Sequence, residues 1–145
     1  MKKLFCVLSV ALFISACSGH YVLEPFEQSR EFTEQGLTAN YIFAKGKILM
    51  DPRISGLEKR RTEARDVALE NARANMLSLI EGSYINESLT VSRLVEGDAF
   101  LESQIAAVIE QNSRTVRTEW TKTDCSVIIR IPRESLKAVG ITLVK

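Results

Sequence analysis

The sequence predicts an α+β domain: a mostly antiparallel four-stranded sheet with two helices packed on one face, in the order β-α-β-α-β-β. Residues 41–50, 84–93 and 115–131 alternate apolar and polar side chains, with the period of a half-buried strand. Residues 57–80 and 98–112 instead repeat their apolar side chains every three or four positions, as amphipathic helices do. Two alternating segments near residue 124 are joined by a short polar stretch, which indicates a hairpin.

The first predicted strand spans residues 41–50 and has two different faces. Its inward face holds Ile42, Ala44, Gly46, Ile48 and Met50. Its outward face holds Tyr41, Phe43, Lys45 and Lys47. Asp51-Pro52 ends the strand, because proline cannot continue the ladder of hydrogen bonds.

The first predicted helix begins at Ser55-Gly56-Leu57-Glu58, which has capping-box spacing, and ends near Ile80, with Gly82 as a left-handed terminator. Its predicted inner face is rich in small residues: Leu57, Ala64, Val67, Ala68, Asn71, Ala72, Asn75 and Leu79. Small side chains let a helix backbone lie close against a sheet. Asn71 and Asn75 are less expected there, since buried amides need partners. They either cap the edge of the sheet or mark where a neighbouring subunit packs.

Residues 84–93 are predicted to form the second strand, with Ile85, Leu89 and Val91 facing inward. The second helix follows, with Asp98 as its N-cap. Its predicted inner stripe consists of Leu101, Ile105, Val108, Ile109 and Asn112. Residues 133–139 are expected to add one more helical turn.

The C-terminal hairpin is predicted to turn at Thr123-Asp124, which pairs Trp120 with Val127 and Arg117 with Arg130. In this register the inward residues meet other apolar residues or a threonine methyl group. Trp120 is therefore expected in the core. Arg117 and Arg130 lie with Tyr41, Phe43, Lys45 and Lys47 on the outer face of the sheet, near Glu119. That face is expected either to be solvated or to serve as an assembly surface.

The beginning of the chain has the features of a secretory signal peptide. Lys2-Lys3 is followed by an apolar stretch, residues 4–13, and by small residues before Cys17. The stretch is shorter than the ~20 apolar residues that span a bilayer. The run Ile14-Ser15-Ala16-Cys17 resembles the lipobox of bacterial lipoproteins. That resemblance implies that residues 1–16 are removed and that Cys17 becomes a lipidated first residue. The alternative is an ordinary signal peptide with a chance cysteine.

The predicted organisation is therefore a signal peptide (1–16), a lipidated N-terminus and tether (17–38), and one periplasmic domain (39–145). The absence of an aspartate after Cys17, where Ser18 stands, implies the outer membrane by the same resemblance. The whole chain has a formal net charge of +1. A near-neutral protein lacks the concentrated basic face that binding of nucleic acid requires. Cys6 leaves with the signal peptide, so Cys125 is the one thiol left to the mature domain. It is expected to be buried, and the alternative is a disulfide between two chains.

A second resemblance involves the first helix. The motif Glu63-Ala64-Arg65-Asp66-Val67-Ala68 continues through Ala72 and Ala74 to Ile80-Glu81-Gly82, and a polar segment follows. This pattern, together with the second helix, the hairpin and the lipobox, resembles small outer-membrane lipoproteins that include flagellar-sheath antigens and the flagellar outer-membrane ring lipoprotein (flagellar assembly protein P). The N-terminal domain of flagellar assembly protein T is similar. The resemblance implies an α+β fold and no catalytic residues. This chain departs from the family pattern in the first strand, where members often have more glycine and this chain has only Gly46.

The sequence offers little for catalysis, so we expect no enzyme activity, cofactor or metal. His20 is the one histidine, and it lies in the predicted tether. The chain has no CxxC or HExxH motif. The densest basic run, Lys59-Arg60-Arg61 with Arg65 and Arg73, either contacts anionic lipid headgroups or forms a solvated helix face paired with nearby acids.

These observations predict a lipid-anchored outer-membrane lipoprotein with a structural role in the cell envelope. Its expected partners are the membrane, through Cys17, and either other copies of itself or other envelope or flagellar proteins. One alternative is a module that binds a peptide, a glycan or a lipid headgroup, through a groove between the helices or through Tyr41, Phe43 and Tyr84. Another is a surface antigen or adhesin.

Overall fold

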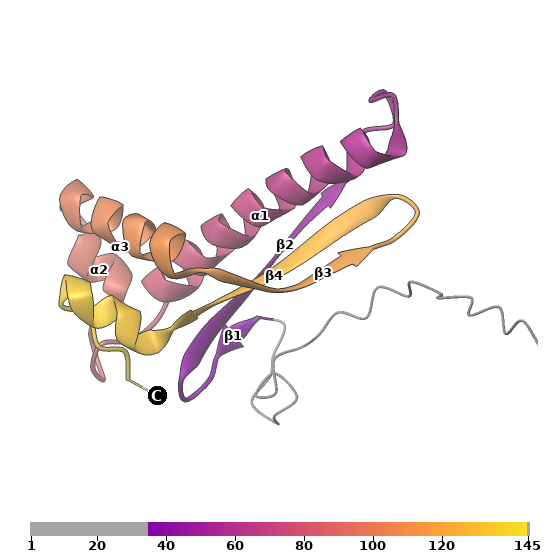
Figure 1. Cartoon of the computed structure of the whole chain (residues 1–145). Helices are drawn as coiled ribbons and strands as arrows, with labels where there is room; N and C mark the ends of the chain where they lie inside the picture. The colour runs from indigo at the N-terminus through magenta and orange to yellow at the C-terminus, as the bar shows by residue number, and fades with distance from the viewer. Residues whose placement is uncertain (1–34, 145) are drawn as a thin grey trace, which may run out of the picture.

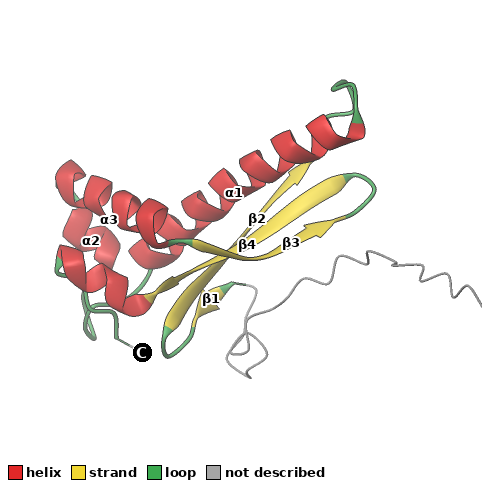
Figure 2. Ribbon diagram, viewed as in Figure 1, coloured by secondary structure: helices red, strands yellow, loops and turns green. Residues whose placement is uncertain are grey.

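The computed structural model describes residues 35–144 and confirms the predicted α+β fold. Its elements are β1 (Gly36–Leu37), β2 (Tyr41–Leu49), α1 (Leu57–Glu81), α2 (Val91–Val95), α3 (Ala99–Asn112), β3 (Arg114–Trp120), β4 (Asp124–Pro132) and the 3₁₀ helix η2 (Arg133–Val139). The four strands form one antiparallel sheet in the order β1-β2-β4-β3. Helix α1 lies along one face of the sheet, and α2, α3 and η2 gather at one end of it (Figures 1 and 2).

The predicted strand at residues 84–93 is wrong. This segment is a tight loop followed by α2, with an isolated bridge between Tyr84 and Thr90. The side-chain oxygen of Asn86 accepts hydrogen bonds from the backbone N–H groups of Ser88 and Leu89 at 3.0 and 2.9 Å. An asparagine that binds its own downstream backbone in this way turns the chain and competes with strand pairing. The fourth strand is instead β1, which falls within the stretch assigned to the tether.

Helix α1 packs closely against β2. The buried residues of α1 recur at every fourth position: Ala64, Ala68, Ala72, Met76 and Ile80. Gly46 of β2 faces this stripe so closely that an added Cβ would lie 2.9 Å from the Cα of Ala72 and would also collide with the carbonyl oxygen of Ala68. The predicted role of small residues is thus confirmed. Val67 and Leu57 were expected on the inner face but are 46% and 51% exposed, because only this narrow stripe meets the sheet.

Both predicted end signals of α1 are wrong. The N-cap position is Gly56, at φ 88°, and no side chain caps the helix. Gly82 has a right-handed helical conformation, at φ −72°, so it does not act as a left-handed terminator. Its backbone N–H donates to the carbonyl of Ser78 and thereby prolongs the hydrogen-bonding pattern of the helix.

The hairpin forms where predicted, but its register differs. Trp120 lies opposite Cys125 and Thr118 opposite Val127, so the turn falls at residues 122–123. The register also shifts between Thr115 and Arg117, so Arg114 rather than Arg117 lies opposite Arg130. A β-bulge places one extra residue in a strand and cannot be recognised from alternation alone. Trp120 still faces the helices and packs against the core, as predicted.

The predicted N-cap of α3 and the predicted helical turn after β4 are confirmed, whereas Asn112, which was expected on the inner stripe of α3, is exposed. The side chain of Asp98 accepts a hydrogen bond from the backbone N–H of Leu101 at 3.0 Å, which caps α3. The segment Arg133–Val139 forms η2, which ends at Gly140 in the left-handed conformation. Ile105, Val108 and Ile109 of α3 join the core. The domain therefore has two layers, with the core between the helices and one face of the sheet.

Candidate interaction surface

The main candidate surface is the sheet face that lies away from α1, which we call the basic face. Its cations are Lys45, Lys47, Arg114, Arg117 and Arg130, and its acids are Glu119 and Asp124. Tyr41, Phe43, Ser126 and Ile128 share this face, because residues opposite one another in an antiparallel pair point to the same side. The structure thus brings together the six outer-face residues expected from the sequence and adds Arg114.

Glu119 organises the positive charge on the basic face. One carboxylate oxygen of Glu119 lies 3.1 Å from Nε of Arg117, and the other lies 3.7 Å from Nζ of Lys45. The hydroxyl of Ser126 donates to Glu119 at 3.3 Å. Lys47 pairs with Asp124 at 3.2 Å. The two acids therefore hold three cations in place across three strands, and the face keeps an excess of positive charge.

The end of the basic face near Tyr41 combines positive charge with aromatic rings. The guanidinium carbon of Arg130 lies 5.0 Å from the centre of the Tyr41 ring, and the rings of Tyr41 and Phe43 are 6.2 Å apart. A guanidinium over an aromatic face is a favourable cation–π geometry. Tyr41, Arg114 and Arg130 also line a hollow of about 430 Å³ beside the end of α3. This end of the face has the chemistry to receive carboxylate groups and apolar side chains.

The expected aromatic cluster of Tyr41, Phe43 and Tyr84 is not formed. Phe43 is buried, and Tyr84 lies beside the C-terminal segment, where its carbonyl accepts a hydrogen bond from the N–H of Val144. A groove between α1 and α3 is present, however. It encloses about 320 Å³ and is lined by Glu70, Arg73, Ala74, Leu77, Ala106, Ile109 and Glu110.

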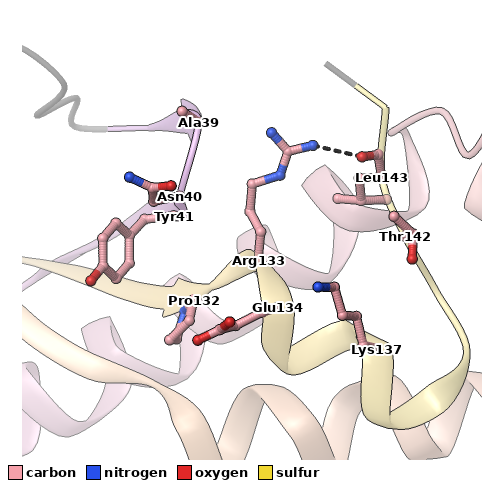
Figure 3. Close-up of a pocket in the computed structure, with 9 residues that line it drawn as sticks. All are labelled: Ala39, Asn40, Tyr41, Pro132, Arg133, Glu134, Lys137, Thr142 and Leu143. Carbon is pink, nitrogen blue, oxygen red and sulfur yellow. Dashed lines mark hydrogen bonds between the residues drawn. The ribbon is translucent and has the colours of Figure 1, made fainter.

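A larger hollow of about 510 Å³ lies beside the start of β2 and η2 (Figure 3). Arg133 crosses it and donates to the carbonyls of Thr38, Leu143 and Val144 at 2.9, 2.9 and 3.2 Å. These three hydrogen bonds tie the C-terminal segment to the β1–β2 turn. The role of Arg133 is thus to hold the two segments together.

Asn71 and Asn75 cap the open edge of β2. Their amide groups donate to the backbone carbonyls of Lys47 and Lys45 at 3.1 and 2.8 Å. Beyond the two-residue strand β1, these carbonyls have no neighbouring strand among the described residues. Of the two roles that the sequence left open for these asparagines, the structure supports capping of the sheet edge.

The basic residues of α1 have partners within the chain. Three form ion pairs with acids on the same helix: Lys59 with Glu63 at 3.9 Å, Arg65 with Asp66 at 3.1 Å and Arg73 with Glu70 at 2.7 Å. Arg60 donates to the carbonyl of Ile54, and the guanidinium of Arg61 lies 5.7 Å from the centre of the Trp120 ring. This pattern supports the interpretation of a solvated helix face paired with nearby acids.

Cys125 is buried in the core, as expected, and burial raises the pKa of its thiol. A raised pKa keeps the thiol protonated and unreactive. Cys17 and His20 lie outside the described residues. Between residues 35 and 144, no group of three or more histidine, cysteine, aspartate or glutamate side chains has an arrangement that could hold a metal ion.

No protein-family model matches the chain, and no curated protein matches its sequence. Among the described residues, no helix combines the length and the apolar character needed to cross a bilayer.

Proposed function

We propose that this protein is a lipid-anchored lipoprotein of the bacterial outer membrane, with a structural role and a domain that faces the periplasm. The observation that carries the proposal is Ile14-Ser15-Ala16-Cys17, placed after a basic start and a short apolar stretch. Cys17 is the proposed site of lipidation. Two or more acyl chains give stable attachment, because each buried CH₂ contributes ~0.8 kcal/mol.

The features of the domain suit a role in assembly. The basic face provides a surface of several residues rather than a closed cavity, and its cations are held in place by Glu119 and Asp124. An anchor would confine such domains to two dimensions and raise their effective concentration, so that weak lateral contacts become sufficient for an array. The partners in this proposal are further copies of the chain or other envelope proteins.

The finer form of the proposal is a component of the flagellar outer-membrane ring, which is supported by the resemblance of the first helix and the lipobox. The experiment is swimming motility of a strain that lacks the gene, complemented with wild type or with Cys17→Ala. We expect motility to be lost and to return only with the lipidated form. Unchanged motility would leave a general envelope lipoprotein whose partners are found by crosslinking.

A second candidate function is an envelope module that binds a peptide, a glycan or a lipid headgroup, favoured by the groove between α1 and α3. Leu77, Ala106 and Ile109 give that groove an apolar floor, and Glu70, Arg73 and Glu110 supply charges. A rise in melting temperature with one of these ligands, abolished by Ala106→Trp, would support this function. Protease treatment of whole cells tests the surface-antigen alternative, because a periplasmic domain is protected.

A further inference from the structure

The geometry points to a docking site for the chain's own N-terminal segment: residues 18–34 bind the basic face of the sheet. This inference rests on the proposed function, because it concerns the segment between the anchor cysteine and the domain. Four observations support it: the complementary charges of the segment and the face, the burial of residues on the face, the point where the chain enters the sheet, and the hydrogen bonds at the edge of β2.

The charges of the two partners are complementary. The basic face holds five cations and two acids, which leaves an excess of positive charge. Residues 18–34 contain four glutamates, Glu24, Glu27, Glu31 and Glu34, and a single cation, Arg30. The same segment contains Phe26 and Phe32, which suit the aromatic end of the face. Hydrogen bonds between arginine and carboxylate groups are among the strongest in proteins.

Burial shows that the basic face is not simply solvated. Phe43, Ile128 and Arg130 are 2%, 0% and 7% exposed, although α1 lies on the opposite side of the sheet (Figure 1). The stems of the neighbouring Lys45 and Arg117, which flank Ile128 on the adjoining strands, account for part of this burial. A charged residue such as arginine is rarely this buried without further packing around it. A covering segment supplies that packing.

The path of the chain places the segment beside this face. Gly36 pairs with Phe43, so the chain enters the domain along the edge of β2. Gln35 lines a hollow of about 410 Å³ together with Lys45, Lys47, Asn71 and Asn75. Seventeen residues precede Gln35 in the proposed segment, and an extended chain spans up to ~3.4 Å per residue. The segment is therefore long enough to cross the three strands, which lie ~4.8 Å apart.

The edge of β2 directs the segment onto the face instead of along the edge. Extension of β1 would need the backbone groups of Lys45 and Lys47. Their carbonyls already accept hydrogen bonds from Asn75 and Asn71. Backbone pairing is thus obstructed at Lys45 and Lys47, the next two residues of β2 whose carbonyls point to this edge. The side chains of both lysines remain on the basic face. Docking through side chains is the arrangement that these contacts allow.

Docking would set the distance between the domain and the membrane. A docked segment holds the domain next to its anchor, whereas a released segment of 17 residues reaches up to ~60 Å.

The test is carbodiimide crosslinking, which joins carboxylates to lysines in direct contact, applied to the mature chain with Cys17→Ser. We expect intramolecular links from Glu27 and Glu31 to Lys45 or Lys47, identified by mass spectrometry of the monomer band. Glu34 is excluded from scoring, because only Gln35 separates it from β1 in the sequence. The Lys47–Asp124 pair, at 3.2 Å, is an internal positive control for the chemistry.

The matched control is charge exchange. Lys45→Glu with Lys47→Glu should abolish the links. In the same variant, Glu27→Lys and Glu31→Lys should restore crosslinking, now from lysines in the segment to glutamates at positions 45 and 47. As a control, exchange of the exposed pair Lys59 and Glu63 should leave the original links unchanged. Links found only in the dimer band would assign the face to a second copy of the chain and would overturn the inference. The inference would also fail if the unchanged chain gave the Lys47–Asp124 link but no link from Glu27 or Glu31. The chain used here carries no lipid, so the result is independent of whether Cys17 is an anchor.

Discussion

At the scale of single residues, the domain depends on a few positions where size or charge leaves little choice. Gly46 lets α1 approach β2, and the two asparagines of α1 satisfy backbone carbonyls that a neighbouring strand would otherwise bind. Arg133 joins two segments distant in sequence. These residues stabilise the packing of the helix on the sheet and the position of the chain ends, and this packing holds the strands that carry the basic face.

Gly46→Ala should destabilise the domain by at least about 2 kcal/mol, because the new methyl group would collide with the backbone of α1, which cannot rotate away. Urea unfolding followed by circular dichroism measures the change. Gly82→Ala is the control: Gly82 has helical dihedral angles and room for a Cβ, so we expect a change within about 1 kcal/mol, in the stabilising direction. Equal losses for the two variants would contradict the close packing of α1 on β2.

Asp51 should titrate with a pKa of about 2, below its ordinary value of 3.8, because Arg53 donates side-chain and backbone hydrogen bonds to it. A lowered folded-state pKa means that this contact stabilises the fold above pH ~4 and that its contribution is lost as the pH falls toward 2. Carboxyl NMR measures the midpoint. Arg53→Gln should return the pKa toward 3.8, and an unchanged midpoint would show that Arg53 is not the cause.

At the scale of elements, the two long helices begin in different ways. Helix α3 has a side-chain cap from Asp98, whereas α1 begins at Gly56 without one, even though Ser55 and Glu58 have capping-box spacing. The two outer edges of the sheet are protected in different ways. The edge of β2 is capped by asparagines, and β3 carries a bulge. Both devices disfavour pairing with another sheet.

Asp98→Ala should lower stability by about 1 kcal/mol, because the N–H of Leu101 loses its acceptor. Ser55→Ala should change it by less than about 0.5 kcal/mol, since no side chain caps α1. Thermal unfolding of the two variants in parallel makes the comparison. A greater loss for Ser55→Ala would mean that the capping box forms after all.

Replacing both Asn71 and Asn75 by alanine should free two carbonyls on the β2 edge. We expect a loss of about 0.5–1 kcal/mol for each hydrogen bond, together with concentration-dependent association, because an open edge is a template for another strand. Sedimentation velocity detects the association. Asn112→Ala is the control, since its amide bonds only the carbonyl of Val108 in its own helix. A strictly monomeric double variant would argue against edge protection.

Much of the fold was predictable, because it follows from periodicity. The alternation of residues 41–50 predicted β2, and the spacing of four in residues 57–80 predicted the alanine stripe of α1. Asp98 predicted the start of α3. The hairpin register was not predictable, because a displacement of the pairing by two residues leaves the same side chains on each face, and alternation cannot detect it. The further shift at Val116 is equally hidden from alternation. Residues 84–93 were misassigned for a related reason: Asn86 turns the chain through its own side chain, and the apolar residues around it still alternate.

The candidate surface was predicted only in part. Lys45, Lys47, Tyr41 and Phe43 share a face because side chains alternate along β2. Arg114 was missed because the β3 bulge, rather than sequence parity, places it opposite Arg130. Residues 36–37 gave no strand signal, because two residues are too few for a period. The link from Arg133 to Leu143 joins segments whose proximity depends on the whole fold.

At the scale of the whole molecule, the chain combines Cys17, the segment 18–34 and a two-layer domain. The central claim is that Cys17 is a lipid-modified first residue. If the claim holds, the basic face operates at a membrane surface, and docking of residues 18–34 controls how far the domain extends from it. If it fails, the domain loses the confinement on which the proposed assembly depends.

The most direct test is mass spectrometry of the N-terminal peptide of the protein purified from the membranes of its native host. The account predicts a peptide that begins at Cys17 and carries acyl chains, and it predicts that the Cys17→Ala variant leaves the membrane fraction. A peptide that begins elsewhere, or an unmodified Cys17 in protein that stays with the membrane, would contradict it.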